Sequence, residues 1–268
     1  MLTTIFAFIK RDFLQNKAYS FAFSLRFAGI FFTTMLWFFI SRIFSEMNLS
    51  YLKEYKGDYF SFVIIGIVVS RFLTIGVNSF SNFIKYEQVS GTLEAMLTTA
   101  TKVSAIMLSS VLWVFIIASI DMFFCLSIAA IFLKANIVNG NFFPFIAISL
   151  LSYLIFSGIG IMSASFVIVF KRGDPINMAL NFMFTFFGGV YYPITVLPAY
   201  LQKISCLLPI TYSLNAMRNS LIKGYAIKDL YADIIPLFIF LVVIMPCSII
   251  IFNRALKKAK TDGSLTHF

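Results

Sequence analysis

Six long apolar runs dominate the sequence and restrict the fold that it can adopt. They cover about residues 20–44, 59–83, 103–133, 142–170, 175–193 and 231–253. Each run meets or approaches the roughly 20 residues that an α-helix needs to cross the hydrocarbon core of a bilayer. We therefore expect an all-α integral membrane protein, with six transmembrane helices in a single domain over residues 1–268.

The composition agrees with a membrane location. Hydrophobic residues make up 60% of the chain and charged residues only 12%, whereas a soluble domain carries roughly 25% charged residues. In a soluble chain, the net charge of +10 would suggest a nucleic-acid partner. Here the basic residues gather at the ends of the apolar runs, where they act as an orientation signal. We expect the lipid bilayer, and no nucleic acid, to surround this chain.

Basic residues flank alternate ends of the runs. They precede the first run, lie between the second and third and between the fourth and fifth, and follow the sixth: Lys10, Arg11, Lys17, Lys85, Lys102, Lys171, Arg172, Arg254, Lys257, Lys258 and Lys260. Because positively charged loops stay in the cytoplasm, both termini and the segment between the second and third runs are predicted to be cytoplasmic. The location expected is the plasma (inner) membrane of a multi-pass protein.

The N-terminal segment, residues 1–18, has its own pattern. Apolar residues from Leu2 to Phe13 mark one face of a helix, and Lys10 and Arg11 lie off that face. This pattern predicts an amphipathic helix lying along the membrane surface. The alternative is a cleaved signal peptide, but its positive charges should precede the apolar stretch, whereas here they follow it.

A short polar segment, Glu87–Ala100, separates the second and third runs. From Thr92 on, Leu93, Met96, Leu97 and Ala100 recur at helical spacing, which predicts a short amphipathic helix over about 88–100. Gly91 is placed as its N-cap, and Glu94 could bond the free amides at its start. The alternative is a capped turn that only joins two membrane helices.

Prolines interrupt the apolar character between the fifth and sixth runs. Pro193, Pro198 and Pro209 lie in this segment. Two short helices fit it, one from Pro198 through Gln202 and one from about Ile210 to Lys223 that Gly224 ends. Paired on the outer side, they would form a re-entrant hairpin over about 194–223, which requires protein or water around the broken backbone. An ordinary surface loop is the alternative.

Residues for catalysis or metal binding are scarce. The sequence has no phosphate-binding loop of the GxxxxGK[ST] type, so the chain itself is not expected to be an ATPase. His267 is the only histidine, and Cys125, Cys206 and Cys247 lack metal-site spacing,. Gly158–Gly160 is typical of close helix packing rather than of nucleotide binding. We predict no catalytic residue, no metal and no cofactor bound by this chain.

Two charged residues lie deep in the runs. Arg71 is about midway along the second and Asp121 a little past the middle of the third, while Arg26 is nearer an end of the first. An unpaired charge at the bilayer centre costs roughly 2.5–3.5 kcal/mol on insertion scales. The hypothesis is an Arg71–Asp121 ion pair, inside the helix bundle or across a dimer. Alternatively, Arg71 faces a water-filled path and binds anionic cargo.

With these features in view, the chain resembles the membrane subunit of type-2 ABC transporters. The similarity rests on several segments that lie in the order of that family: Glu87–Ala100, Lys171–Ile176, Gly188–Pro193, Leu197–Pro198, Leu208–Tyr212 and Arg218. Two departures are Gln88, where the family usually has Arg, and Ala100–Thr101, where it usually has Thr-Pro. They put a sharp end to the 88–100 helix in doubt.

The resemblance implies a function and partners. Such permeases have six spanning helices, work as dimers and export drugs, lipids or lipid-linked glycans, using ATP and Mg on separate ATPase subunits. It implies a homodimer, or a heterodimer with a similar subunit. The implied coupling residues to the ATPase are Glu87, Gly91, Thr92, Leu93, Glu94, Met96 and Leu97. An outer re-entrant gate would contain Pro193, Pro198, Pro209, Tyr212 and Arg218.

Two other function classes compete with this interpretation. An ion-gradient-driven secondary transporter or channel would need polar residues along the membrane midplane and often internal repeats. A membrane-embedded enzyme would need a histidine or metal cluster. The sequence does not identify the transported substrate, although a hydrophobic, lipid-like, glycolipid or drug cargo suits the apolar composition.

Overall fold

The chain is described from a computed structural model. The structure describes residues 6, 7, 9–11, 13, 14, 20–45, 58–89, 91, 103–137, 140–170 and 174–261. These residues form helices and connecting turns and no strand. The longer helices are α2 (Ser20–Ser45), α3 (Tyr59–Val89), α5 (Val103–Ile131), α6 (Phe142–Phe170), α7 (Asp174–Phe187), α8 (Ala199–Ser205), α9 (Pro209–Arg218) and α10 (Tyr231–Thr261). Between these helices lie two short 3-10 helices, η2 (Ile194–Val196) and η4 (Ile227–Leu230), and one π turn, η3 (Asn219–Lys223).

Five described helices are long and apolar enough to cross a membrane, which confirms an all-helical membrane protein. They are α2, α3, α5, α6 and α10. The predicted count of six is not confirmed, because α7 has only 14 residues. At 1.5 Å per residue it is about 21 Å long, short of the hydrocarbon core of about 30 Å. The predicted fifth span, 175–193, ends early because Gly189 adopts a φ of +75°, which turns the chain out of the helix.

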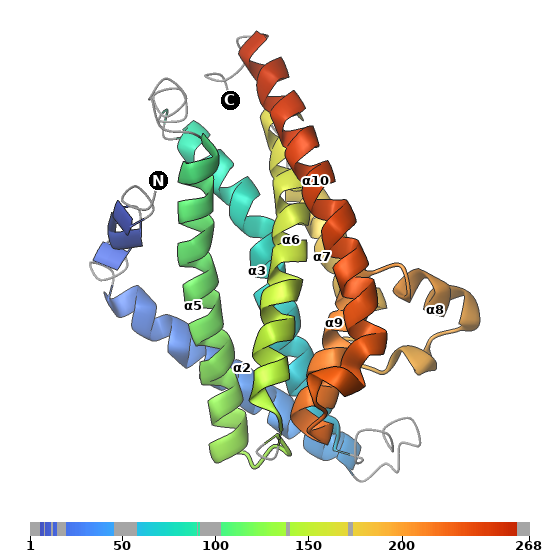
Figure 1. Cartoon of the computed structure of the whole chain (residues 1–268). Coiled ribbons are helices and arrows are strands. Elements are labelled where there is room, and N and C mark those ends of the chain that lie inside the picture. Colours follow the sequence, from blue (N-terminus) through green and yellow to red (C-terminus); the bar gives the residue numbers. More distant parts are fainter. Residues whose placement is uncertain are drawn as a thin grey trace.

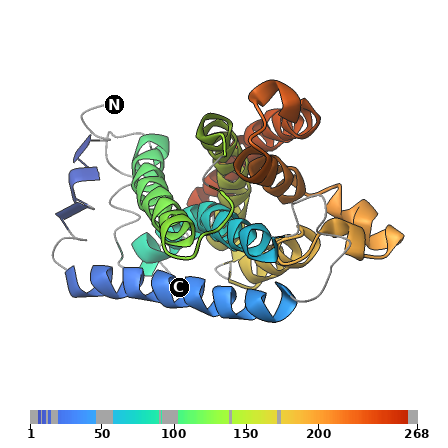
Figure 2. The ribbon, with the colours of Figure 1, turned by 90° about the horizontal axis from the view of Figure 1, so that it is seen from below.

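The centre of the bundle is formed by α6 and α3. Helix α6 packs mainly against α3 and α10, and α3 also packs against α5 (Figure 1). Seen from below, α2 lies along one edge of the molecule, outside the other long helices (Figure 2). Most of α3 is buried, whereas most of α2 and α10 is exposed on the single chain. Lipid or another protein must therefore cover the outer faces of α2 and α10.

Two glycines let α6 pack closely against its neighbours, as the sequence predicted for Gly158–Gly160. A Cβ atom on Gly160 would lie 2.7 Å from the carbonyl oxygens of both Gly76 and Val77 in α3. A Cβ atom on Gly158 would meet the Cγ2 atom of Ile244 in α10 at 2.8 Å. Small residues of this kind bring helices together where no hydrophobic effect between helices is available.

Buried polar side chains attach the short helix α7 to α3 and α6. The Asn177 side chain donates a hydrogen bond to the Ser81 hydroxyl at 2.7 Å. In turn, the Ser163 hydroxyl of α6 donates to the Asn177 side-chain oxygen. One turn further along α7, the Asn181 amide contacts the Asn78 side-chain oxygen at 3.4 Å. These bonds hold α7 beside α3 even though α7 is short, because bonds between helices stabilise membrane bundles.

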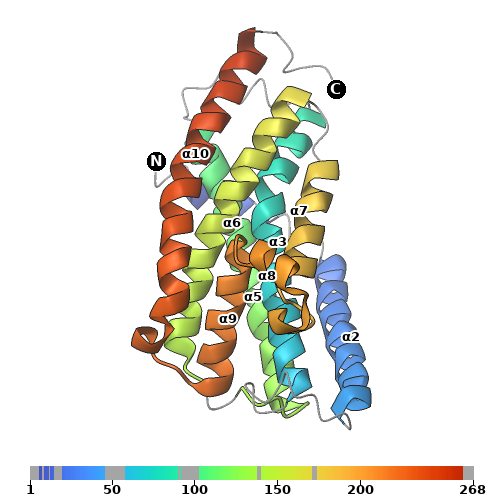
Figure 3. The same cartoon turned by 90° about the vertical axis from the view of Figure 1, so that its right-hand side faces the viewer.

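The segment after α7 folds into two short helices. Helix α8 begins after Pro198, and α9 has Pro209 in its first turn. The π turn η3 continues α9 and ends at Gly224, whose φ is +74°, the left-handed conformation in which many helices end. In Figure 3, α8 lies about half-way along the height of α3, and α9 lies beside the lower half of the bundle. Re-entry of residues 194–223 into a bilayer stays a prediction.

Helix α2 is oblique to the other long helices. In Figure 1 it starts beside the middle of α5 and runs down to the lower end of the bundle. We call that lower end, which contains η3 and the turn after α5, the outer end, following the predicted topology. Of the N-terminal segment, the described residues are helical, and the Phe13 ring meets the Trp113 ring of α5 edge-on at 6.0 Å. The other residues of 1–18 lie outside the described part, so the surface helix stays a prediction.

The glycine contacts predict different outcomes for two alanine substitutions. Gly160→Ala places its Cβ against backbone oxygens that cannot rotate away, so we expect a loss of about 1–3 kcal/mol and a lower melting temperature in detergent. Gly158→Ala meets one side-chain methyl, the Ile244 Cγ2 atom, rather than two backbone oxygens, so its loss should be smaller. Equal melting temperatures for the two variants would contradict a close α3–α6 backbone contact.

Candidate functional site

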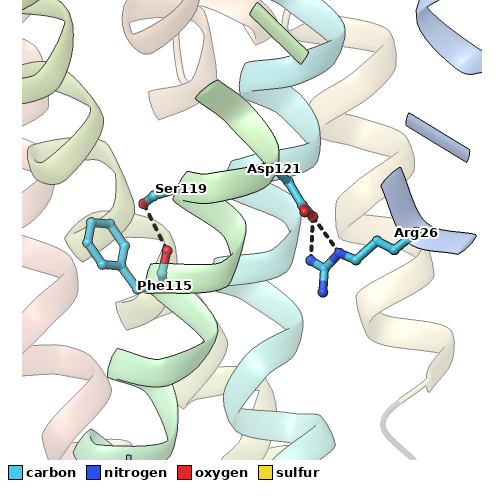
Figure 4. Close-up of polar contacts among 4 residues, drawn as sticks. All are labelled: Arg26, Phe115, Ser119 and Asp121. Atoms are coloured by element: carbon cyan, nitrogen blue, oxygen red, sulfur yellow. Dashed lines mark hydrogen bonds and ion pairs between the residues drawn. The ribbon is translucent and has the colours of Figure 1, made fainter. Parts of the chain in front are cut away.

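A charged pair lies inside the bundle between α2 and α5. The Arg26 Nε atom donates to the Asp121 Oδ2 atom at 2.7 Å, and the Arg26 Nη2 atom contacts the same oxygen (Figure 4). The Asp121 side chain is 7% exposed and that of Arg26 is 32% exposed. Two donors from one guanidinium onto a carboxylate form a strong charge-assisted contact. The pair neutralises Asp121 in the interior of α5.

This contact gives Asp121 a different partner from Arg71, the residue that the sequence hypothesis paired with it. That hypothesis placed residues at equal depth by counting along neighbouring, upright spans. Because α2 is oblique and begins beside the middle of α5 (Figure 1), Arg26 lies at the depth of Asp121 although it is near the start of its own helix. An Arg71–Asp121 contact across a dimer stays a prediction.

Arg71 lies beside the pair but makes no hydrogen bond or ion pair among the described residues. Its side chain is exposed on the single chain. It lines a small cavity between α2, α3 and α5 together with Asp121, Thr33, Thr34 and Cys125. The cavity offers about 30 Å³ of room for water-sized groups, which is enough for one or two water molecules. A larger molecule does not fit this cavity and could reach Arg71 only from the surface of the chain, where the Arg71 side chain is exposed.

A second polar centre lies near the outer end, around Arg218 of α9. This side chain is 3% exposed. Its guanidinium donates to the carbonyl oxygens of Phe62 at 3.2 Å, Gly189 at 2.8 Å and Val190 at 2.8 Å. It also lies over the Phe62 ring, with Cζ 3.5 Å from the centroid. A Cβ on Gly66 would come within 2.3 Å of Arg218 Nη2, so α3 needs a glycine there.

The Arg218 contacts fasten the chain where α7 ends. Gly189 and Val190 lie just beyond Gly188, the first residue after α7, and their carbonyl groups no longer have helical partners. A cation next to such carbonyls also interacts favourably with the helix dipole. The arrangement joins α3, the end of α7 and α9 at one point. The resemblance named Arg218 as a gate residue, and the structure gives it this contact set.

The other predicted gate residues lie in separate places around this point. Pro193 precedes η2, Pro198 precedes α8, and Pro209 starts α9. The Tyr212 hydroxyl donates to the carbonyl oxygen of Cys206 at 2.9 Å, which closes the turn between α8 and α9. These four residues shape the segment, and a gating role for them stays a prediction.

One contact in this region was not anticipated from the sequence. The Asn215 side-chain amide bonds both carboxylate oxygens of Asp233, at 2.9 and 3.0 Å, and so joins α9 to the first turn of α10. The sequence signal was an acidic residue at the start of an apolar run, where it would interact favourably with the helix N-terminus. The sequence contains no signal that marks Asn215 as its partner.

The predicted coupling segment is described only in part. Glu87 lies in the last turn of α3 and is buried. Gly91 has a φ of +67°, a left-handed conformation that suits the residue after a helix, whereas an N-cap has extended backbone. Gly91 thus follows the end of α3 rather than acting as an N-cap. Thr92, Leu93, Glu94, Met96 and Leu97 lie outside the described residues, so their coupling role stays a prediction.

The described residues offer no site for a metal ion. In them, no group of three or more His, Cys, Asp or Glu side chains lies together. The polar groups that do converge are an ion pair in the interior and an arginine on carbonyl oxygens. Both groups of contacts join neighbouring helices to one another.

Comparison with protein families decides the identity. The family described as ABC-2 type transporter matches residues 3–222, which is most of the chain. The chain belongs to the ABC-2 type transporter family. No curated protein matches it. An ABC-2 chain is the membrane domain of an ABC transporter, a permease and not itself an ATPase, and the family generally works with an ATPase partner. The apolar helices agree with a multi-pass membrane protein.

The Arg26–Asp121 contact leads to a prediction on folding of this ABC-2 permease. Arg26→Leu should lower stability by about 3–5 kcal/mol, because it leaves the buried Asp121 carboxylate without its partner. Asp121→Leu should lower it by less, because the Arg26 side chain that then loses its partner is 32% exposed and its charge is screened by solvent,. The double variant should recover much of the loss, as measured by thermal unfolding in detergent. Arg71→Leu combined with Asp121→Leu is the control and should recover little. Full recovery in that control would assign Asp121 to Arg71 instead.

A further prediction concerns Arg218. Arg218→Met keeps the apolar stem but leaves the carbonyls of Gly189 and Val190 without donors, and each charged hydrogen bond contributes about 1.5–3 kcal/mol. We expect a marked loss of folded protein by fluorescence-detected gel filtration. Lys203→Met, at an exposed cation in α8, should have little effect. Similar yields for both variants would show that Arg218 does not fasten the end of α7.

Proposed function

We propose that this chain is the permease subunit of an ABC exporter, driven by ATP hydrolysis on a separate cytoplasmic ATPase subunit. The observation that carries the proposal is the family match over residues 3–222. The chain would provide the translocation path for a hydrophobic, lipid-like, glycolipid or drug substrate. ATP and Mg would bind only to the partner.

The proposed assembly is a dimer of permease chains with two ATPase subunits. Several exposed apolar residues along α2 support a second protein or lipid on that face, among them Phe21, Phe32, Leu36, Phe39 and Ile43. The proposed location is the plasma membrane with both termini in the cytoplasm. Export, rather than import, is proposed from family resemblance.

The proposed contact with the ATPase is the segment after α3. Helix α3 is 31 residues long, about 46 Å at 1.5 Å per residue, so its last turns would extend beyond a hydrocarbon core of about 30 Å. Residues 88–100 would then lie at the cytoplasmic surface, where the Leu93, Met96 and Leu97 face could enter a groove of the ATPase subunit.

The proposed function is tested by purifying the tagged chain from its native membrane in mild detergent. A P-loop ATPase subunit should accompany it in about equal amount. The Leu93→Asp/Leu97→Asp variant should insert normally but lose transport and the coupling of ATPase activity to it, because two charges cannot enter an apolar groove. Thr98→Asp, on the opposite face of the predicted helix, is the matched control.

Two results would contradict the proposal. If no ATPase accompanies the chain and transport follows an ion gradient, the chain is a secondary transporter. If the double Asp variant transports as well as the wild type, the 88–100 segment does not couple the ATPase to the path.

A further inference from the structure

Two cavities lie along one seam of the molecule, between α2, α3 and α5. The inner one is lined by Arg71 and by Asp121, whose carboxylate is paired with Arg26. The outer one has a volume of about 310 Å³ and is lined by residues at the outer ends of α2 and α3 and in the turn after α5, including Arg42, Tyr59 and Lys134. Twelve residues of α3 separate Arg71 from Tyr59, which is about 18 Å along the helix. The seam therefore runs from the middle of the bundle to its outer end.

Among the described residues at the two cavities, cations exceed carboxylates. In the inner one, Asp121 is already held by Arg26, so Arg71 adds a positive charge that no described carboxylate neutralises. In the outer one, Asp58 accepts hydrogen bonds from the backbone amides of Phe60 and Ser61 at 3.1 and 3.3 Å. Its charge therefore interacts with the start of α3. Lys134 lines the open space, and so does Arg42, whose guanidinium lies over the Phe38 ring.

Lys134 occupies an unusual backbone position. Its φ is +53°, the one positive value among the described residues other than glycine. The Ala135 amide donates to the Ala129 carbonyl at 2.9 Å, so the chain folds back onto the end of α5 at Lys134. Glycine is usual at that position because it has no Cβ, and a residue with a side chain is strained there. Such strain is typical of positions kept for function.

The sides of the seam are apolar. The inner cavity has Ile30 and Phe72 in its wall, and the outer cavity has Phe38, Tyr59 and Phe60. A molecule lying here would meet cations along the seam and hydrocarbon beside it. This combination suits an amphiphile whose headgroup is anionic and whose tails stay in the lipid.

We propose that the α2–α3–α5 seam carries the anionic headgroup of a lipid-like cargo, with Arg71 as its contact in the middle of the bundle and Lys134 as its contact at the outer end. The proposal rests on the proposed function and narrows its substrate class to anionic amphiphiles. The headgroup chemistry is a phosphate or similar anion, which arginine and lysine bind by charge-assisted hydrogen bonds. Arg71 gains the partner that a charge in the membrane interior requires.

The test measures lipid bound to the full chain, purified with the ATPase that accompanies it, by native mass spectrometry. The probes are phosphatidylglycerol and phosphatidylcholine. We expect the wild type to retain phosphatidylglycerol preferentially. Arg71→Gln and Lys134→Gly should each lower its retention roughly tenfold, as loss of a charged hydrogen bond does. Lys203→Gln, at an exposed cation of α8 outside the seam, should leave the retention unchanged.

Lys134→Gly separates binding from folding. Because glycine relieves the strained φ, this variant should melt at a higher temperature than the wild type while it binds less phosphatidylglycerol. A fall in both the melting temperature and the binding of phosphatidylglycerol would mean that Lys134 has only a structural role, and it would overturn the outer contact. Arg71→Lys, which keeps the charge, should retain most of the binding. If Arg71→Gln binds as the wild type but loses dimer, Arg71 pairs with a second copy instead of cargo.

Three further outcomes are decisive. If millimolar inorganic phosphate displaces the lipid and both lipids bind equally, the seam recognises a free anion and the cargo proposal fails. If all variants keep the wild-type lipid preference while the ATPase still accompanies the chain, the seam proposal fails and the ABC exporter proposal stands. Loss of the ATPase partner from the wild type would instead contradict the exporter, whatever the lipid result.

Discussion

A polar backbone group in hydrocarbon needs a partner within the protein, and this requirement governs the outer half of the structure. Helix α7 ends after 14 residues, and the carbonyl groups that follow it lie inside the bundle. Arg218 supplies donors to Gly189 and Val190 and to Phe62 of α3. A planar guanidinium can serve several acceptors at once in fixed directions, which a lysine ammonium does less well. Arg218 of α9 therefore satisfies the carbonyl groups that the end of α7 leaves without partners in the helix.

The same contact shows which parts of the fold could be predicted from sequence. Apolar runs indicate long helices because their length is set by the bilayer, and four of them match the observed elements closely. The two helices after Pro198 and before Gly224 could also be predicted, since proline and glycine act locally on φ. The length of α7 could not be predicted, because residues 175–193 are apolar throughout. Its end depends on Gly189 and on a cation nearly thirty residues later in the chain.

The polar site was predictable only to the level of residue type. Asp121 was identified as a buried charge that needs a cation, and it has one. The identity of that cation depends on the tilt of α2, and tilt is set by packing and not by the apolar pattern. Asn215 and Asn177 gave no sequence signal, because an amide in a membrane helix has no preferred partner until the helices are assembled. Family resemblance indicated Arg218, whereas its three carbonyl partners needed the fold.

Helix α3 connects these features along one rigid element. From its outer to its inner end it contributes the Phe62 carbonyl and Gly66 to the Arg218 contact, Arg71 to the seam, and Ser81 to the bond with α7. Its contact with α6 through Gly160 leaves little freedom to slide, because backbone atoms meet there. A force applied at the inner end of α3 would therefore reach the seam and the Arg218 contact as a movement of the whole helix. In the proposed exporter, that is the physical route by which ATP hydrolysis on the ATPase subunit, transmitted through residues 88–100, could act on cargo about half a bilayer away.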